Sequence, residues 1–312
     1  MAGNQFSSFT FCSITCNQEK YILDNLSSIK YQIEKYGQNI ECFFILADDC
    51  SEDNTVSIVK EWLRKNEELF ADIVYLVNKE RKGTVCTYIE ALRNISTEYF
   101  AFLSGDDLFY KNSIFDGFKG TYNICPTISF DDKQHSKYEN NDITYELLLN
   151  RSNNEKLRRI LSERLKLHMS PCAPSIKFTK SMVTKKVMDS VRGLKWIEDY
   201  PMHKAMYDND DIRIYIHDKP LVLYRIHTGV STNSNHENRY EFKREEAMVI
   251  KEICPYYKKN MYLNPYQYVY HFTKRFNEIF KYRQCKEIIA LQRDSISIEE
   301  QVRNYLGIIR DE

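Results

Sequence analysis

Two pairs of adjacent carboxylates are the residues of this chain whose types and spacing most suggest chemistry. Asp48 and Asp49 follow one apolar run, and Asp106 and Asp107 follow another. Two carboxylates at close range repel each other, which raises the pKa of both. A divalent cation such as Mg2+ or Mn2+ offsets this repulsion and can bridge to a phosphate group. The alternative is that each pair only caps a helix or fills a turn. Two pairs at strand ends favour the ligand interpretation, because open α/β sheets bind ligands there.

The first pair is suited to a nucleotide. Ser51 or Asp53 can cap the helix that follows, which leaves the carboxylates of Asp48 and Asp49 free. A carboxylate at this place can accept a base N–H or a ribose hydroxyl.

The second pair is the better metal site. Gly105 precedes Asp106 and Asp107 and lets the backbone approach a ligand closely. Lys82, with two further basic residues just before it, can donate charge-assisted hydrogen bonds to a diphosphate. A solvated loop explains these basic residues equally well.

A third acidic motif joins Glu198 and Asp199, and Pro201 follows it. Proline favours a helix start, so Asp199 is either a helix-start residue or a general base beside an aromatic cluster. His227 lies between a predicted strand end and a glycine turn. It is a metal ligand only if it lies near Asp107, and otherwise a structural histidine.

The candidate carboxylates can act together only if the strands that precede them end at the same edge of one sheet. The apolar runs that predict strands are residues 9–14, 40–47, 72–77 and 98–103. The stretches with apolar residues at helical spacing between them are residues 22–33, 56–63 and 85–92. Strands joined by crossover helices predict a parallel sheet with helices on both faces.

The rest of the chain is less regular. The polar run 131–142 is predicted to be a surface loop or the edge of a substrate channel. Helices are predicted over 150–168 and 181–191 and a strand over 175–179, and the pattern is helical after residue 225.

Composition limits the function further. Basic and acidic residues number 44 each, which gives no overall signature of nucleic-acid binding. No stretch approaches the roughly 18 apolar residues of a membrane span, and no signal-peptide pattern opens the chain. Nine cysteines without a CxxC pair predict reduced thiols rather than disulfides or zinc. We therefore expect a cytoplasmic protein.

The stretch 251–293 combines many basic and aromatic side chains with few acidic ones. Such a helical surface fits a peripheral contact with anionic lipid. An ordinary packed helix pair or a dimer contact is the alternative, and the sequence leaves the oligomeric state open.

Taken in order, the motifs resemble those of the inverting family 2 glycosyltransferases with the GT-A fold, which move a sugar from a nucleotide donor to an acceptor hydroxyl. The resemblance covers roughly residues 8–235. Residues 45–55 (ILADDCSEDNT) are similar to the acidic base-binding motif and residues 102–107 (FLSGDD) to the metal-binding DxD region. Residues 198–200 (EDY) are similar to the catalytic ED motif, and residues 224–227 with Ser231 to the tail motif that closes over the donor phosphates.

The resemblance implies a role for each candidate residue. Asp199 would be the general base with Glu198 beside it, while Asp49 would bind the base and Asp48 support the turn. The residues implied to contact the remainder of the nucleotide donor are Thr15, Asn17, Glu19, Lys82, Asp106, Arg225 and His227. The residues implied to hold Mn2+ or Mg2+ are Asp106, Asp107 and His227.

The chain departs from the family pattern at three positions. Ser104 stands at the first acidic position of the usual LDxDD run, which leaves the main metal ligand open between Asp106 and Asp107. Cys50 replaces the usual glycine and Cys16 the usual tyrosine, and both changes touch the predicted base pocket.

The resemblance also implies the organisation of the chain. It predicts an α/β, Rossmann-like GT-A fold with a mostly parallel central sheet. The helical pattern of the residues beyond the resemblance predicts a C-terminal helical extension. The donor-binding half would span residues 1–130, the acceptor-binding and catalytic half 131–235, and the extension 236–312.

The implied function is metal-dependent, inverting transfer of a sugar from a nucleotide-diphosphate sugar, UDP by default, to a glycan hydroxyl. The acceptor would be a growing, lipid-linked surface glycan at the inner face of the membrane. One alternative is a non-catalytic, nucleotide-sugar-binding component of a polysaccharide assembly complex. A nucleotidyltransferase would need a glycine-rich phosphate loop, which residues 16–19 lack.

Overall fold

The computed structural model describes most of the chain. The described residues are 6–133, 135–138, 145–171, 173–226, 228–231, 233, 235–256, 269, 272 and 298–311.

A parallel four-stranded sheet in the order β3-β2-β1-β4 forms the centre of the first half. Its strands are β1 (Ser8–Thr15), β2 (Glu41–Asp48), β3 (Asp72–Val77) and β4 (Phe100–Ser104). In the register of the sheet, Thr15 pairs with Asp48 and Ile14 pairs with Ser104. The two strands that precede the carboxylate pairs therefore flank β1 and end at the same edge.

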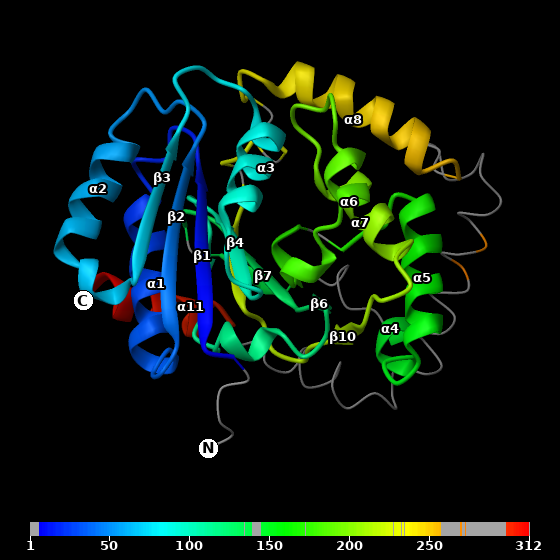
Figure 1. The fold of residues 1–312 in the computed structure, drawn as a ribbon, viewed down its shortest axis with the longest axis horizontal. Coiled ribbons are helices and arrows are strands. Elements are labelled where there is room, and N and C mark those ends of the chain that lie inside the picture. The colour runs from blue at the N-terminus through cyan, green and yellow to red at the C-terminus, as the bar shows by residue number, and fades with distance from the viewer. Residues whose placement is uncertain are drawn as a thin grey trace.

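Helices cover both faces of this sheet (Figure 1). They are α1 (Ile22–Tyr36) and α2 (Thr55–Lys65) on one face and α3 (Thr84–Asn94) on the other. Phe9 and Phe11 of β1 are buried in the core shared with α1 and α2, whereas Cys12 is buried in the core shared with α3. This burial on both faces explains why the central strands read as continuous apolar runs.

Short strands and helices build the second half. Three strands form a sheet in the order β10-β6-β9: β6 (Tyr122–Ile124), β9 (Ile176–Phe178) and β10 (Ile214–Ile216). Four others form a sheet in the order β5-β11-β7-β8: β5 (Leu108–Phe109), β7 (Thr127–Phe130), β8 (Ser136–Tyr138) and β11 (Val222–Arg225). The helices are α4 (Tyr145–Leu149), α5 (Asn154–Lys166), α6 (Lys185–Ser190) and α7 (Asp199–Tyr207).

Among the described residues of the predicted C-terminal extension, helices α8 and α11 pack on different parts of the fold. Helix α8 (Arg239–Ile253) lies against α7, and α11 (Ile298–Asp311) lies against α1 (Figure 1). The Tyr305 hydroxyl donates a 2.8 Å hydrogen bond to the Phe109 carbonyl. The described parts of the extension therefore contact both halves, while the division into three parts stays a prediction.

The structure confirms the predicted α/β fold with its mostly parallel central sheet and C-terminal helices. The helix predicted over 181–191 is shorter, because Thr184 caps α6 by accepting the Val187 N–H at 3.3 Å. A strand end was predicted before His227, and β11 ends there, at Arg225. The other strands within 108–130 and 214–225 were not predicted. They are only two to four residues long, which is too short for a periodic pattern.

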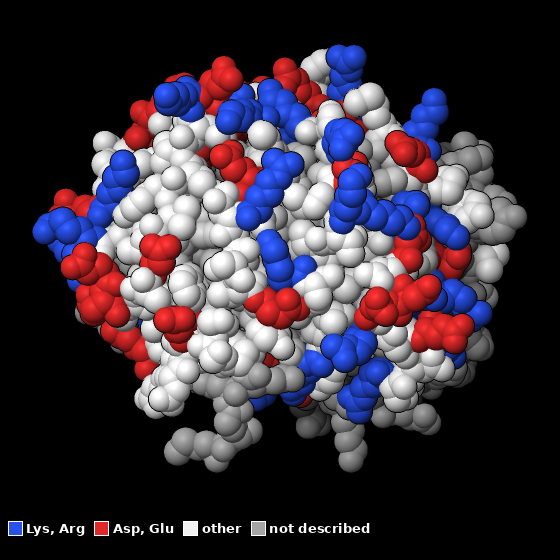
Figure 2. Space-filling view, viewed as in Figure 1, with Lys and Arg blue, Asp and Glu red and all other residues white. Residues whose placement is uncertain are grey.

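Lys and Arg are interspersed with Asp and Glu over the face shown in Figure 2, as the balanced composition suggests. In the described part of the chain, no helix combines the length and the apolar character that a membrane crossing requires. The predicted lipid contact over 251–293 lies outside the described residues, except for 251–256, 269 and 272.

Candidate active site

The turn after β2 is held by Asp48. Its carboxylate accepts hydrogen bonds from the Thr15 hydroxyl at 2.6 Å, from the Ser51 N–H at 2.8 Å and from the Ser51 hydroxyl at 2.6 Å. The expectation that Asp48 is free for a ligand is therefore wrong. The fully buried carboxylate supports the turn, as the resemblance implies.

The neighbouring Asp49 holds a second loop. It accepts hydrogen bonds from the Asn78 amide at 3.1 Å, the Lys82 N–H at 2.8 Å and the Gly83 N–H at 2.9 Å. The expectation that this carboxylate is free is wrong as well, because both of its oxygens bind the loop that leads into α3. Base binding by Asp49 stays a prediction.

The turn after β1 is joined to the turn after β2. The Asn17 side chain accepts the Glu52 N–H at 2.8 Å, and the Glu19 carboxylate accepts the Asn54 N–H at 3.0 Å. Asn17 has a φ of 53°, in the left-handed region that asparagine tolerates. Asn17 and Glu19 thus shape the predicted nucleotide-contacting turn.

Asp106 is bound within the protein on both of its carboxylate oxygens. The Ser104 hydroxyl at 2.5 Å and the Gln18 amide at 3.2 Å donate to Oδ1, and the Thr228 hydroxyl donates to Oδ2. Ser104, which departs from the family pattern, therefore holds its acidic neighbour.

Asp107 lines the pocket, and its carboxylate accepts fewer hydrogen bonds than that of Asp106. Among the described residues, its carboxylate accepts one hydrogen bond, from the main-chain N–H of Arg225, which lies 2.8 Å from Oδ1. Burial, and next the charge of Asp106, raise the pKa of Asp107 well above its usual range, while Arg225 and Lys177 oppose this shift. A carboxylate in this state is one that a cation would stabilise.

The Arg225 guanidinium is buried and held by acidic and carbonyl groups. It donates to Asp24 at 3.2 Å, to Asp132 at 3.1 Å and to the Asp106 carbonyl at 2.9 Å. It thereby ties α1 and the start of the polar 131–142 run to the loop after β4. Its contact with donor phosphates stays a prediction, and His227 lies outside the described residues.

Lys82 contacts the site with its backbone N–H group. Its N–H donates to Asp49, while its side chain lines a separate hollow beside Met188 and Arg192. Its neighbour Arg81 forms an ion pair with Glu237. Contact of the Lys82 ammonium with a diphosphate stays a prediction.

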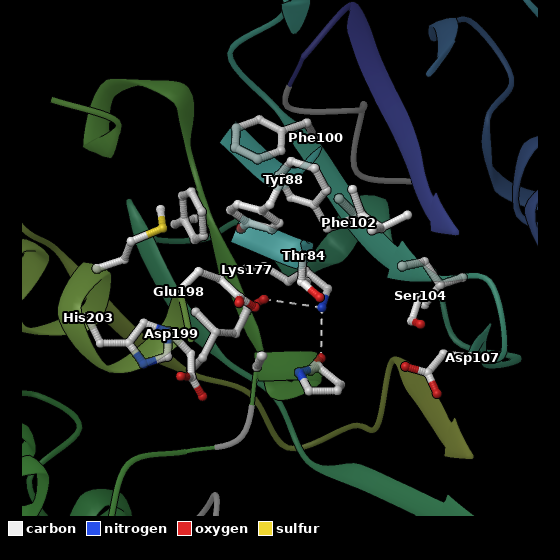
Figure 3. A pocket seen from close by; sticks show the side chains of 18 residues that line it. Thr84, Tyr88, Phe100, Phe102, Ser104, Asp107, Lys177, Glu198, Asp199 and His203 are labelled. Carbon is white, nitrogen blue, oxygen red and sulfur yellow. Dashed lines mark hydrogen bonds between the residues drawn. The ribbon is translucent and has the colours of Figure 1, made fainter. Parts of the chain in front are cut away.

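One pocket brings the second and third acidic motifs together. Figure 3 shows Asp107 on one side and Glu198, Asp199 and His203 on the other, with Lys177 between them. The motifs are far apart in sequence, so only the fold of the second half places them around one space.

Aromatic side chains form part of the pocket wall. The rings of Tyr88 and Phe102 lie 4.1 Å apart, on the side where Figure 3 shows Phe100 as well. This wall screens the carboxylates from bulk water, so charges in the pocket interact more strongly than in solution.

Asp199 is the first residue of α7, as the following Pro201 suggested. Its Oδ1 accepts the Tyr200 N–H at 2.8 Å. Burial raises the pKa of Asp199, and burial together with the charge of Asp199 raises the pKa of Glu198. Two adjacent carboxyls in a cleft are thus held closer to neutral pH than exposed ones, which suits proton transfer.

Sequence reasoning missed Lys177 and His203. The Lys177 ammonium donates to the carbonyls of Pro174 at 2.8 Å and Ile176 at 3.2 Å. His203 lies 3.0 Å from the Ser170 hydroxyl, and burial lowers its pKa to about 4, so it is neutral. A lysine inside the apolar run 175–179 was the one available signal, because a lysine is seldom buried without a specific partner.

A parallel sheet that carries two carboxylate pairs at its strand ends, opposite a third pair, is typical of α/β enzymes, which bind their ligands at this edge of the sheet. The family model of glycosyl transferase family 2 matches residues 10–185. The match covers more than half of the chain. The chain therefore belongs to glycosyl transferase family 2, and it is a glycosyltransferase.

Two bacterial relatives agree with this assignment. An uncharacterized glycosyltransferase of Rickettsia typhi and one of Rickettsia prowazekii are each 25% identical over 283 residues, which covers 80% of this chain and 80% of theirs.

A solved structure shows the same fold. S. aureus TarS 1–349 in complex with UDP-GlcNAc matches with a TM-score of 0.51 and 18% identity, over 78% of this chain and 65% of that one. This chain thus spans slightly less than two thirds of that TarS structure. At this identity the likeness concerns the fold, which is GT-A.

Proposed function

We propose that this glycosyltransferase moves a sugar from a UDP-sugar to an acceptor hydroxyl of a growing surface glycan, with inversion at the anomeric carbon. The observation that carries the proposal is the placement of Asp107 and Asp199 around one pocket. A donor whose diphosphate lies at Asp107 would place its sugar toward Asp199, where the acceptor would enter.

Asp199 is the proposed general base. Because the Tyr200 N–H holds Oδ1, we assign proton acceptance to Oδ2. The acceptor hydroxyl gives its proton to Asp199 while its oxygen forms a bond to the anomeric carbon, and the bond from that carbon to the diphosphate oxygen breaks on the opposite face. The electron pair leaves with the nucleoside diphosphate, so one displacement inverts the configuration.

The residues present fit a divalent cation held together with the donor. The described part of the chain contains no cluster of three or more His, Cys, Asp or Glu suited to a metal. Mg2+ and Mn2+ commonly bind through one or two carboxylates plus substrate phosphates and water. Asp107 would supply the main carboxylate, since both oxygens of Asp106 are bound within the protein. When bound, the ion would neutralise charge on the leaving diphosphate.

UDP is the proposed nucleotide because TarS, which shares this fold, was crystallised with UDP-GlcNAc. The test is isothermal titration of UDP, GDP, dTDP and CMP, each with and without Mn2+, against wild type and Asp107→Ala. Tight, metal-dependent binding of UDP that the substitution abolishes would support the proposal. Binding of none would refute the donor site. Binding of a nucleotide without turnover would favour the non-catalytic component.

The acceptor is proposed to be lipid-linked and reached from the inner face of the membrane through residues 251–293. Their basic and aromatic composition supports this contact. Co-sedimentation with liposomes of anionic lipid tests it, and protein that stays in the supernatant at low salt would refute it.

A further inference from the structure

Helix α8 places one buried carboxylate directly under the catalytic motif. Glu245 Oε1 accepts the Trp196 N–H at 2.7 Å and the Ile197 N–H at 2.8 Å, and its Oε2 accepts the Lys195 N–H at 2.8 Å. The residue is 8% exposed. Hydrogen bonds to an ionised acceptor are about twice as strong as neutral ones, so this contact fixes the loop firmly.

The three N–H groups belong to the residues immediately before Glu198. The Glu245 carboxylate therefore holds the backbone that leads into Glu198 and Asp199 at the start of α7. Helix α8 packs against α7, outside the sheet that carries the first two motifs (Figure 1). The contact thus comes from a helix beyond residue 185, where the family match ends.

The same loop touches the turn that Asp49 holds. The Val85 N–H donates to the Lys195 carbonyl at 3.1 Å, and a Cβ placed on Gly83 would lie 2.5 Å from that carbonyl oxygen. Asp49 in turn accepts the Gly83 N–H at 2.9 Å. A continuous set of contacts therefore runs from Asp49 through Gly83 and Lys195 to Glu245.

We propose that Glu245 is a positioning residue for the catalytic pair: it fixes Glu198 and Asp199 relative to the turn held by Asp49. Helix α8 is then part of the active centre rather than an appended element. The proposal rests on the proposed function, because it takes Asp199 as the general base.

The charge of Glu245 acts on the pair as well. It raises the pKa of Glu198, after the larger effects of burial and of Asp199. The titratable or charged groups that face the pair from the surrounding elements are Lys177 of β9, Tyr88 of α3, His203 and Tyr207 of α7, Asp107 after β4, Glu245 and Glu246 of α8, and Cys254 directly after α8. Neutralising Glu245 removes one negative charge from this set, so the pKa of Glu198 should fall.

Three variants separate geometry from charge. Glu245→Gln keeps the length of the side chain but loses its charge and one acceptor oxygen. Glu245→Asp keeps the charge but withdraws both oxygens by one methylene. Glu241→Gln is the matched control, because Glu241 lies on the same helix and meets the exposed Lys195 ammonium at 3.4 Å, away from the backbone N–H groups.

The first measurement is amide hydrogen exchange over residues 195–197 in the full chain, with circular dichroism to confirm folding. We expect exchange at these amides to rise between about tenfold and a hundredfold in Glu245→Asp, and at Lys195 in Glu245→Gln. The control should match wild type. Unchanged exchange in both Glu245 variants, or an equal rise in Glu241→Gln, would overturn the proposal.

The second measurement is the titration of the Glu198 carboxyl by 13C NMR, assigned through Glu198→Gln. Its midpoint should move to lower pH in Glu245→Gln and stay near the wild-type value in Glu245→Asp. A carboxylate without electrostatic influence on the pair would move neither midpoint, and a stationary midpoint in Glu245→Gln would count against the placement of Glu245 beside Glu198.

The third measurement is turnover with the donor that the nucleotide screen identifies. We expect kcat to fall more than tenfold in Glu245→Asp with little change in the KM of the donor, since the chemistry and not binding depends on the pair. Rapid amide exchange with unchanged kcat would overturn the positioning role. If wild type shows no turnover, the proposed function is refuted. The positioning proposal can still be tested in that case, because amide exchange and carboxyl titration need no substrate.

Discussion

The main-chain N–H of Arg225 lies 2.8 Å from the carboxylate of Asp107. This hydrogen bond joins β11 to the loop after β4 and fixes the direction of the carboxylate that faces the pocket. The Arg225 side chain is held by Asp24 and Asp132 at the same time. Arg225 therefore orients the Asp107 carboxylate without lining the pocket itself, and Asp107 is the residue that we propose contacts the ligand.

Asp107→Asn should abolish metal-dependent nucleotide binding while it leaves this hydrogen bond in place. Amide oxygen still accepts the Arg225 N–H, but the charge that attracts the cation is gone. Affinity for the nucleotide in Mn2+ should fall at least about tenfold, since even the loss of a metal's outer-shell partner has that effect. Titration calorimetry with and without Mn2+ measures it.

The same variant should be more stable than wild type when no metal is present. Burial raises the pKa of Asp107 above its unfolded value, so ionised Asp107 opposes folding. This penalty is absent below the unfolded pKa and grows as the pH rises toward the folded pKa. A Tm above that of wild type at pH 7 is expected, and a lower Tm would contradict the assignment of Asp107 as a strained, ligand-facing carboxylate.

Asp199→Asn should lower the transfer rate by about 10²–10⁴-fold, the usual contribution of a general base. Nucleotide binding should stay within a few-fold of wild type, because Asp199 lies at the acceptor side of the pocket. Undiminished transfer, or product that retains the anomeric configuration by NMR, would refute the mechanism.

The pH dependence of transfer by wild type should reflect the raised pKa values of Glu198 and Asp199. Burial raises the pKa of both Glu198 and Asp199, so the acidic limb of kcat/KM should lie above the value near 4 of ordinary carboxyls. Activity is expected to fall as the pH drops through this raised pKa, because the base becomes protonated. A rate that stays constant down to pH 4 would contradict the assignment.

The sequence predicted the central sheet well and the second half poorly, for a physical reason. Strands such as 40–47 are covered on both faces, so burial leaves a continuous apolar run that is visible in one sequence. Strands of two to four residues carry no such pattern, and their pairing with distant segments decides where they lie. The placement of Lys177 depends on that pairing.

The hydrogen bonds of the candidate residues were not predicted, and the ligand-binding and catalytic roles of these residues stay predictions. Carboxylates at strand ends were visible, yet the donors that occupy Asp48 and Asp49 lie on other turns and could not be read from spacing. The hydrogen bond of Thr15 to Asp48 follows from the β1–β2 register, which pairs these two residues. The role of Glu245 depends on a long-range contact of α8, which no local motif signals.

Thr15→Val should destabilise the protein by about 1.5–3 kcal/mol, because it removes a hydroxyl donor from the buried Asp48 carboxylate. The shape of the side chain is retained, so the loss is that of the hydrogen bond to a charge. Urea unfolding measures it.

Thr10→Val on the same strand is the matched control. The Thr10 hydroxyl is 2.7 Å from that of Thr97, a neutral pair, so about 0.5–1.5 kcal/mol is expected. Equal losses at the two positions would show that the charge of Asp48 gives the Thr15 contact no extra strength.

Gly83→Ala should disturb both the turn held by Asp49 and the loop before the catalytic pair. Gly83 has a φ of 92°, and a Cβ there would lie 2.3 Å from Lys195 Cγ and 2.5 Å from the Lys195 carbonyl oxygen. The side chain can move, but the carbonyl belongs to the loop that Glu245 fixes. The ψ of Gly83 is 161°, so its backbone lies in a region that essentially only glycine adopts. We therefore expect a loss of more than about 3 kcal/mol, the upper cost of such a conformation alone, together with weaker nucleotide binding.

Gly193→Ala is the control for a positive φ without a close contact. Gly193 has a φ of 84° and lies just before the same loop, but nothing lies within 4 Å of a Cβ placed on it. It should lose only about 1–2 kcal/mol and bind nucleotide like wild type. The difference in stability between the two variants contains both the contact of Gly83 with Lys195 and the cost of the glycine-specific backbone conformation of Gly83. If the two behave alike in stability and in nucleotide binding, the turn at Asp49 and the catalytic loop are not coupled through Gly83.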